Sequence, residues 1–116
     1  MEPKRRVVIE SPYAGNTDAL TERNIRYVRA CLRDSLLRGE APFASHALYT
    51  LPGVLDDRVA EERELGIAAG FEWRQGAHTA FYLDLGWSPG MLRGKKVCLL
   101  HGHSYDERYL GDRWQA

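Results

Sequence analysis

A strand-like segment that leads through a turn into a long helical pattern constrains the fold of this chain more than any other feature. Val7-Val8-Ile9 is a continuous run of β-branched residues, which is typical of a strand covered on both faces. Ser11-Pro12 ends that strand because proline cannot donate a ladder hydrogen bond. Gly15-Asn16 favours a turn. The segment therefore predicts the first strand-to-helix unit of an α/β fold.

The helix that follows is predicted to begin near Thr17, with Asn16 or Thr17 as its cap, and to end at Gly39. Its apolar residues recur at helical spacing and form one stripe. Most of its arginines fall off the stripe, and we interpret them as a solvated face. The members of the stripe are Leu20, Tyr27, Val28, Cys31, Leu32 and Leu36.

The rest of the chain continues the alternation of strands and helices. Residues 41–49 predict a second strand and its exit loop, and residues 77–83 predict a third strand. Between them, a helix is predicted from Asp56 or Asp57 to the turn at Gln75-Gly76. The apolar run at residues 96–101 predicts a fourth strand after only a short turn.

This alternation favours a parallel sheet with helices on its faces. Right-handed crossovers would then bring three segments to one edge of the sheet. These segments are the loop at residues 11–17, the region of His46 and the loop at residues 84–91. Ligands of open α/β sheets bind at this carboxyl edge, so we expect the site there.

The length of 116 residues indicates a single domain. We predict an α/β domain at residues 1–101 and a C-terminal tail at residues 102–116, which docks on the body or on a partner subunit because its aromatic residues are unusual for a disordered tail. The formal net charge is zero, which argues against a general attraction to nucleic acid or membranes.

Two cysteines, Cys31 and Cys98, lie inside apolar patterns and match neither a disulfide framework nor a metal-binding spacing. We expect both to pack as small apolar side chains in a reducing compartment. No apolar run approaches the roughly 20 residues of a membrane span, and no signal-peptide core is evident. The expectation is a cytoplasmic protein without a cofactor or metal, since His101-Gly102-His103 lacks an evident third ligand.

Four motifs follow one another along the chain. They are Glu10-Ser11-Pro12-Tyr13-Ala14-Gly15-Asn16, Ala41-Pro42-Phe43-Ala44-Ser45-His46, the stretch from Glu64-Leu65-Gly66 through Gly70-Phe71-Glu72-Trp73, and Asp84-Leu85-Gly86-Trp87-Ser88-Pro89-Gly90-Met91. Together, in this order, they resemble small phage and bacterial proteins that are distantly related to the nucleoside 2-deoxyribosyltransferases and nucleotide N-glycosidases. The resemblance covers roughly residues 5 to 94. It implies a flavodoxin-like three-layer fold with a small parallel sheet of about four strands.

The resemblance implies that the loops after the first and third strands bind a nucleoside or nucleotide. His46 is a candidate acid, base or ligand contact, and Trp87 is a candidate stacking face for a base. Packing roles remain open for both, and for Tyr13. The candidate ligand-binding residues are Ser11, Pro12, Tyr13, Gly15, Asn16, His46, Trp87, Ser88, Gly90 and Met91.

The chain departs from the family where the glutamate of the helix after the third strand is expected. Leu92-Arg93-Gly94-Lys95-Lys96 contains no carboxylate, and the predicted fourth strand leaves almost no room for that helix. Cleavage of a glycosidic bond needs such a carboxylate. Asp84 and Glu10 are the remaining candidates, although each also fits a structural role.

Three hypotheses follow. The first is a nucleoside- or nucleotide-binding protein that lacks the family glutamate and sequesters or senses a nucleotide or a nucleotide-derived signal. The second is an active N-glycosidase or 2-deoxyribosyltransferase that uses Asp84 or Glu10. The third is an interaction protein whose loops serve only the fold. Active relatives often complete the pocket with a neighbouring subunit, so we expect a homo-oligomer, with no nucleic-acid or membrane partner.

Overall fold

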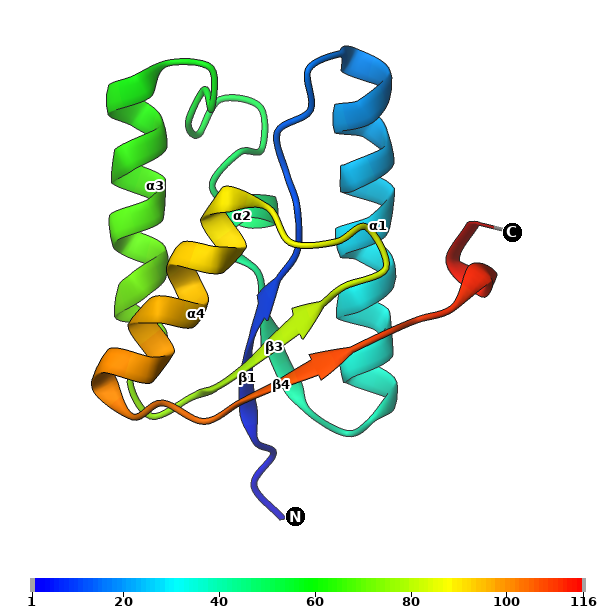
Figure 1. Ribbon diagram of the computed structural model, residues 1–116, viewed down its shortest axis with the longest axis vertical. Helices are drawn as coiled ribbons and strands as arrows, with labels where there is room; N and C mark the ends of the chain where they lie inside the picture. Colours follow the sequence, from blue (N-terminus) through cyan, green and yellow to red (C-terminus); the bar gives the residue numbers. More distant parts are fainter. Residues whose placement is uncertain (1, 116) are drawn as a thin grey trace.

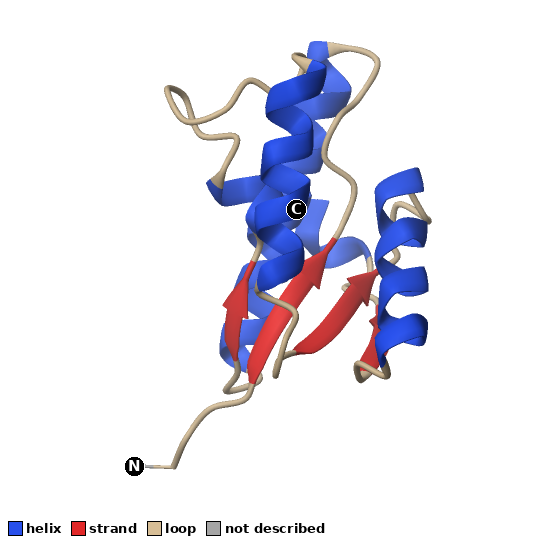
Figure 2. Ribbon diagram, turned by 90° about the vertical axis from the view of Figure 1, so that its left-hand side faces the viewer, coloured by secondary structure: helices blue, strands red, loops and turns tan. Residues whose placement is uncertain are grey.

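The sheet at the centre of the protein has four parallel strands in the order β2-β1-β3-β4. The computed structural model describes residues 2–115, with helices on both faces of the sheet (Figures 1 and 2). This arrangement confirms the predicted flavodoxin-like α/β fold. The strands are β1 (Arg6–Glu10), β2 (Ala41–Phe43), β3 (His78–Tyr82) and β4 (Tyr105–Arg108).

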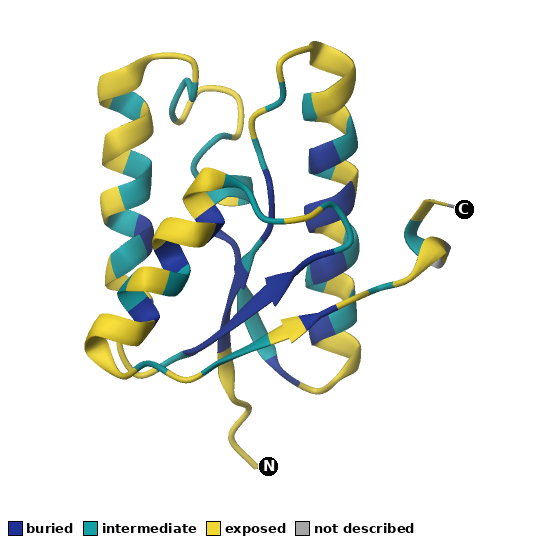
Figure 3. Cartoon of the chain, viewed as in Figure 1, coloured by how far each residue is buried: buried dark blue, intermediate teal, exposed yellow. Residues whose placement is uncertain are grey.

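The two central strands carry the core. Every residue of β3 is buried, and so is the apolar run of β1, which Figure 3 shows in dark blue. On one face, Ala80 and Tyr82 pack with Tyr27 of helix α1 (Asp18–Leu37). On the other face, Phe81 packs with Met91 and Cys98 of helix α4 (Pro89–His101). The alternation of side chains along β3 thus fills the space under both helix layers.

Helix α1 begins where the sequence predicts. The Thr17 side chain accepts a hydrogen bond from the Leu20 amide at 3.2 Å, so Thr17 rather than Asn16 is the cap. Tyr27, Val28 and Cys31 of the predicted stripe are buried, while Leu20 and Leu36 are exposed. The predicted apolar stripe is therefore buried at the centre of the helix and exposed at its two ends.

The segment between β2 and β3 contains two helices. The predicted second strand ends early, because Ser45–Leu48 forms the short helix α2. Helix α3 (Ala60–Glu72) starts later than predicted and packs on α2. A Cβ atom at Gly70 would lie 2.6 Å from the Ser45 Oγ, so glycine permits this close contact.

The predicted strand at residues 96–101 is wrong, because these residues form the second half of α4. The Ser88 side chain caps that helix by accepting from the Met91 amide, Pro89 occupies its first turn, and Gly102 ends it with a φ of 66°. These end signals outweigh a short apolar run, whose Leu99 and Leu100 are exposed. The helix that the resemblance implies is therefore present, contrary to our expectation.

The true fourth strand is β4, which lies beside β3 in the segment predicted as a C-terminal tail. Arg108 of β4 donates hydrogen bonds at 2.7 and 2.8 Å to the two carboxylate oxygens of Glu40, and it lowers the pKa of Glu40 to about 2. Farther along, the Trp114 ring packs edge-on against Tyr27, with 4.9 Å between centroids. The last residues therefore complete the sheet as well as docking on the body.

Cys31 and Cys98 are buried free thiols, which confirms their expected packing role. Within residues 2–115, no helix combines the length and the apolar character that crossing a membrane requires.

Candidate functional site

A cavity of about 390 Å³, which we call the inner cavity, lies at the carboxyl edge of the sheet. Its walls come from the end of β1 and its loop, from α2, from the side of α3 and from the first turn of α4. Seven predicted site residues line it, and they come from three separate stretches of the chain. They are Glu10, Ser11, Tyr13, His46, Ser88, Gly90 and Met91.

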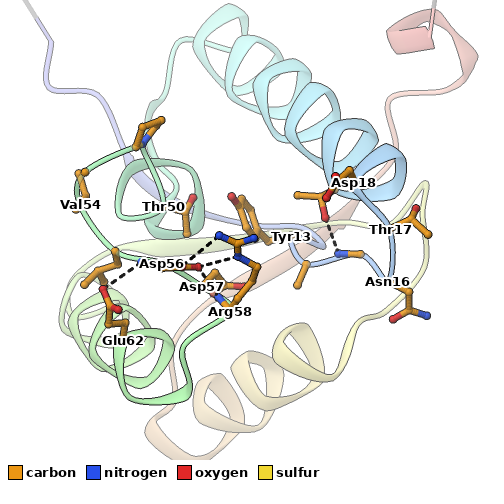
Figure 4. Close-up of a pocket in the computed structure, with 16 residues that line it drawn as sticks. Tyr13, Asn16, Thr17, Asp18, Thr50, Val54, Asp56, Asp57, Arg58 and Glu62 are labelled. Atoms are coloured by element: carbon orange, nitrogen blue, oxygen red, sulfur yellow. Dashed lines mark hydrogen bonds and ion pairs between the residues drawn. The ribbon is translucent and has the colours of Figure 1, made fainter.

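A second cavity of about 740 Å³, the outer cavity, lies on the other side of Tyr13 (Figure 4). The loop before α1 and the loop at residues 50–58 form its walls. Gly15 and Asn16 line this cavity alone, whereas Tyr13 and Asp57 line both. The predicted first loop is therefore divided between two compartments.

Ser11 and His46 form the central polar pair of the inner cavity. The buried Ser11 Oγ lies 2.8 Å from the His46 Nε2, and the Tyr13 ring stands edge-on to the imidazole at 6.3 Å. Burial lowers the pKa of His46 to about 4, because the surrounding protein removes water that would stabilise the charged ring. His46 is therefore neutral at pH 7, and its Nε2 atom forms a hydrogen bond with the Ser11 hydroxyl.

Glu10 ends β1 at the base of the inner cavity, where the Arg74 guanidinium donates a hydrogen bond to its carboxylate. Arg74 lies just after α3, and only 3% of its side chain is exposed. Burial raises the pKa of Glu10, and the opposing attraction of Arg74 does not fully offset it. The site thus holds a buried ion pair next to Ser11.

Helix α4 crosses directly over this ion pair at Gly94. A Cβ atom there would lie 2.8 Å from the Arg74 Nη2 and 3.4 Å from the Glu10 Oε2. Only glycine leaves room for both side chains against the helix. Helix α4 itself carries no Asp or Glu, so Glu10 supplies the carboxylate that lies beside it.

Asp84 has different surroundings. Its carboxylate accepts hydrogen bonds from the Tyr27 hydroxyl and from the backbone amides of Leu110 and Gly111, the latter two at 2.9 Å. Burial acts to raise the pKa of Asp84, but these hydrogen bonds outweigh it and the pKa is lowered. Asp84 therefore anchors the chain after β4 and lines neither cavity.

Pro12 and Trp87 also lie outside the two cavities. The Trp87 ring packs against Phe81 with 5.0 Å between centroids, and the Lys95 ammonium lies 5.0 Å from the Trp87 centroid. Trp87 therefore packs over the sheet on the α4 side. The His101 and His103 rings are 5.7 Å apart, and across residues 2–115 no three His, Cys, Asp or Glu side chains are placed to hold a metal ion.

The structure adds four residues that sequence reasoning missed, namely Arg63, Phe71, Arg74 and Arg93, all of which line the inner cavity. A usable signal was the helical spacing of Arg63, Ile67 and Gly70, which puts these residues on one side of α3, with Arg74 just after the helix at the next such interval. That side faces the cavity.

The model of one protein family, described as a domain of unknown function (DUF7768), matches residues 5–107. The chain belongs to that family. Comparisons with curated proteins and with solved structures found no match. The matched range includes both loops of the site, the strands β1 to β3 and all but the last residue of β4. Because a fold does not by itself specify an activity, the function has to be argued from the site.

Proposed function

We propose that this protein binds a nucleoside or nucleotide in the inner cavity. One observation carries the proposal: the Ser11–His46 pair, Tyr13 and the first turn of α4 converge on a single cavity of about 390 Å³. This volume lies within the range of roughly 300–1,000 Å³ that is usual for small-molecule sites. The resemblance to deoxyribosyltransferases, which predicted the same loops, adds the ligand class.

The lining suits a nucleoside. Tyr13 provides an aromatic ring, and stacking of a base on an aromatic ring is worth roughly 1–3 kcal/mol. Ser11 and the neutral His46 can exchange hydrogen bonds with sugar hydroxyls or with the edge of a base. The site therefore combines an apolar wall with a few fixed polar groups.

Binding without turnover is the role we favour, because α4 offers no carboxylate and Glu10 is held by Arg74. A carboxylate in an ion pair is a weaker nucleophile than a free one. In this view the protein sequesters or senses a nucleotide or a nucleotide-derived signal. The proposal includes a cytoplasmic location and a homo-oligomer that completes the pocket.

The position of Glu10 favours one second candidate, an N-glycosidase or 2-deoxyribosyltransferase. Glu10 lines the cavity beside Ser11, which places a carboxylate next to the expected position of a ligand. Asp84 is less suitable for this role, because three donor groups occupy its carboxylate.

The test is a thermal unfolding series with a panel of nucleosides and nucleotides. A ligand at a hundredfold excess over its Kd stabilises the fold by about 2.7 kcal/mol, which corresponds to a rise in Tm of roughly 10 °C. We expect the rise to shrink in Ser11→Ala and to persist in Lys96→Gln, which changes an exposed residue on α4. If no member of the panel raises Tm, the proposal fails.

Chromatography of the same mixtures separates binding from turnover. Binding alone leaves every nucleotide intact. Release of free base by the wild-type protein, and its loss in Glu10→Gln, would favour the second candidate. Base release that persists in Glu10→Gln would remove Glu10 from the catalytic role.

A further inference from the structure

The charges around the two cavities differ. The inner cavity is lined by three arginines and by the carboxylates of Glu10 and Asp57. The outer cavity is lined by four carboxylates and a single arginine, Arg58, which Figure 4 shows beside Tyr13. Its acidic residues are Asp18, Asp56, Asp57 and Glu62. An anionic group is therefore disfavoured in the outer cavity, even though the N-terminus of α1 lies there.

Building on the proposed function, we propose that the inner cavity binds a phosphorylated nucleotide and holds its phosphate between α3 and α4, through Arg63, Arg74 and Arg93. The sugar and base then lie toward Ser11, His46 and Tyr13. The phosphate is oriented away from the N-terminus of α1.

Arg74 provides the first support. It is almost fully buried and lines the cavity, and its Nε atom has no hydrogen-bond partner within residues 2–115. Glu10 engages only part of the guanidinium. A buried donor without a partner costs about 1–3 kcal/mol. The Arg74 guanidinium lines the cavity and would attract an anion there through its positive charge.

Phe71 provides the second support, because it holds two guanidinium groups on the same wall. The Arg74 and Arg93 guanidinium carbons lie 5.0 and 5.6 Å from the centroid of the Phe71 ring. The ion pair of Arg93 with Glu64 is long, at 3.6 Å, and both side chains are more than half exposed. Such surface pairs contribute little, so Arg93 can turn to a ligand at small cost.

Arg63 completes the group from the side of α3. Its Nε donates a hydrogen bond to the backbone oxygen of Asp57 at 3.0 Å, which fixes the start of the guanidinium. The terminal nitrogens are then free to form the planar fork that matches phosphate oxygens. A phosphate monoester carries a charge of about −1.5 to −2 at pH 7 and offsets the excess positive charge of the cavity.

The test is isothermal titration of the wild-type protein with four ribonucleosides, their 5′-monophosphates and inorganic phosphate. We expect each monophosphate to bind at least about tenfold more tightly than its nucleoside. Arg63→Gln and Arg93→Gln should each reduce this ratio several-fold. Arg58→Gln is the matched control, because it removes an exposed arginine from the outer cavity and should leave the ratio unchanged.

The outcomes separate the two proposals. If nucleosides bind as tightly as their monophosphates, the inference is overturned but the proposed function stands. The same holds if Arg58→Gln reduces the affinity ratio as much as Arg63→Gln and Arg93→Gln do. Inorganic phosphate that binds in the wild type and fails in Arg93→Gln, with no nucleotide binding, supports the arginine site and overturns the proposed ligand class. Absence of all binding overturns both.

Discussion

Glu10 and Asp84 are two carboxylates at the ends of neighbouring strands, and the protein uses them in different ways. Glu10 ends β1, lines the inner cavity and pairs with the buried Arg74. Asp84 follows β3 and is surrounded by the Tyr27 hydroxyl and the amides of Leu110 and Gly111. One carboxylate lines a cavity, and the other holds the chain after β4 in place.

The difference comes from the segment of the chain that lies over the end of each strand. Over β1, α4 presents Gly94 and leaves space beside the carboxylate. Over β3, the chain after β4 turns back and directs two backbone amides at Asp84. A position at a strand exit is therefore not enough to mark a catalytic residue, because neighbouring segments decide whether its oxygen atoms remain accessible.

The largest effect should come from breaking the Glu10–Arg74 pair. Arg74→Met leaves Glu10 buried without its partner, and we expect a loss of about 3–5 kcal/mol in the free energy of unfolding. Urea unfolding measures it. Arg58→Met, in an exposed pair, should change stability by less than about 0.5 kcal/mol. Equal losses in the two variants would contradict the burial of the pair.

Asp84→Asn should cost about 2 kcal/mol, because a neutral amide accepts the Tyr27, Leu110 and Gly111 hydrogen bonds more weakly. Since the folded-state pKa of Asp84 is lowered below its ordinary 3.8, its contribution is present above that pH and is lost as the pH falls through the folded value. Urea unfolding between pH 2 and 7 should show this loss in the wild type.

In Asp84→Asn the acid-dependent part of the stability should be smaller, while nucleotide binding at pH 7 should be unchanged. Glu72→Gln, at an exposed position, is the control for removal of one acidic charge. Loss of nucleotide binding in Asp84→Asn would contradict the purely structural role that we assign to Asp84.

Gly94→Ala should cost about 1–3 kcal/mol, because the new methyl group would overlap Arg74 and crowd Glu10. Gly90→Ala in the same helix is the matched control, since the nearest neighbouring atom would be 4.0 Å from its Cβ. There, the gain in helix propensity should make the change neutral or stabilising by up to about 1 kcal/mol. Thermal unfolding compares the two, and equal effects would refute the close contact over Glu10.

The last expected effect is a loss of stability at mildly acidic pH. The pKa of His46 is lowered to about 4 in the folded state from an ordinary value of 6.5. Because the unfolded chain takes up the proton first, the free energy of unfolding falls by up to about 3 kcal/mol as the pH drops from 6.5 to 4. His46→Gln should flatten this part of the stability profile, and His101→Gln at an exposed position should not.

Much of the fold follows from local patterns. β1, α1 and β3 were predicted within a few residues, because each has a strong period and clear end signals. Residues 96–101 misled the prediction, since a short apolar run fits a strand and a helix equally well. Ser88, Pro89 and Gly102 carried the decisive information, as the two ends of one helix.

The site residues also fall into a group that the sequence predicted and a group that only the structure revealed. Chain order and strand exits predicted that Ser11, Tyr13, His46 and the loop before α4 would meet at one edge. The arginines of the inner cavity could not be assigned this way, because exposed and cavity-facing positions of a charged helix look alike until a neighbouring helix is placed.

The sequence by itself determined the parallel sheet and the edge at which its loops gather, because period and caps are local properties. Only the tertiary structure decided which carboxylate faces the cavity, where positive charge gathers and why residue 94 is glycine. These features depend on distances between segments far apart in the chain. The close approach of α4 to Glu10 and Arg74 is a property of packing, which no local pattern contains.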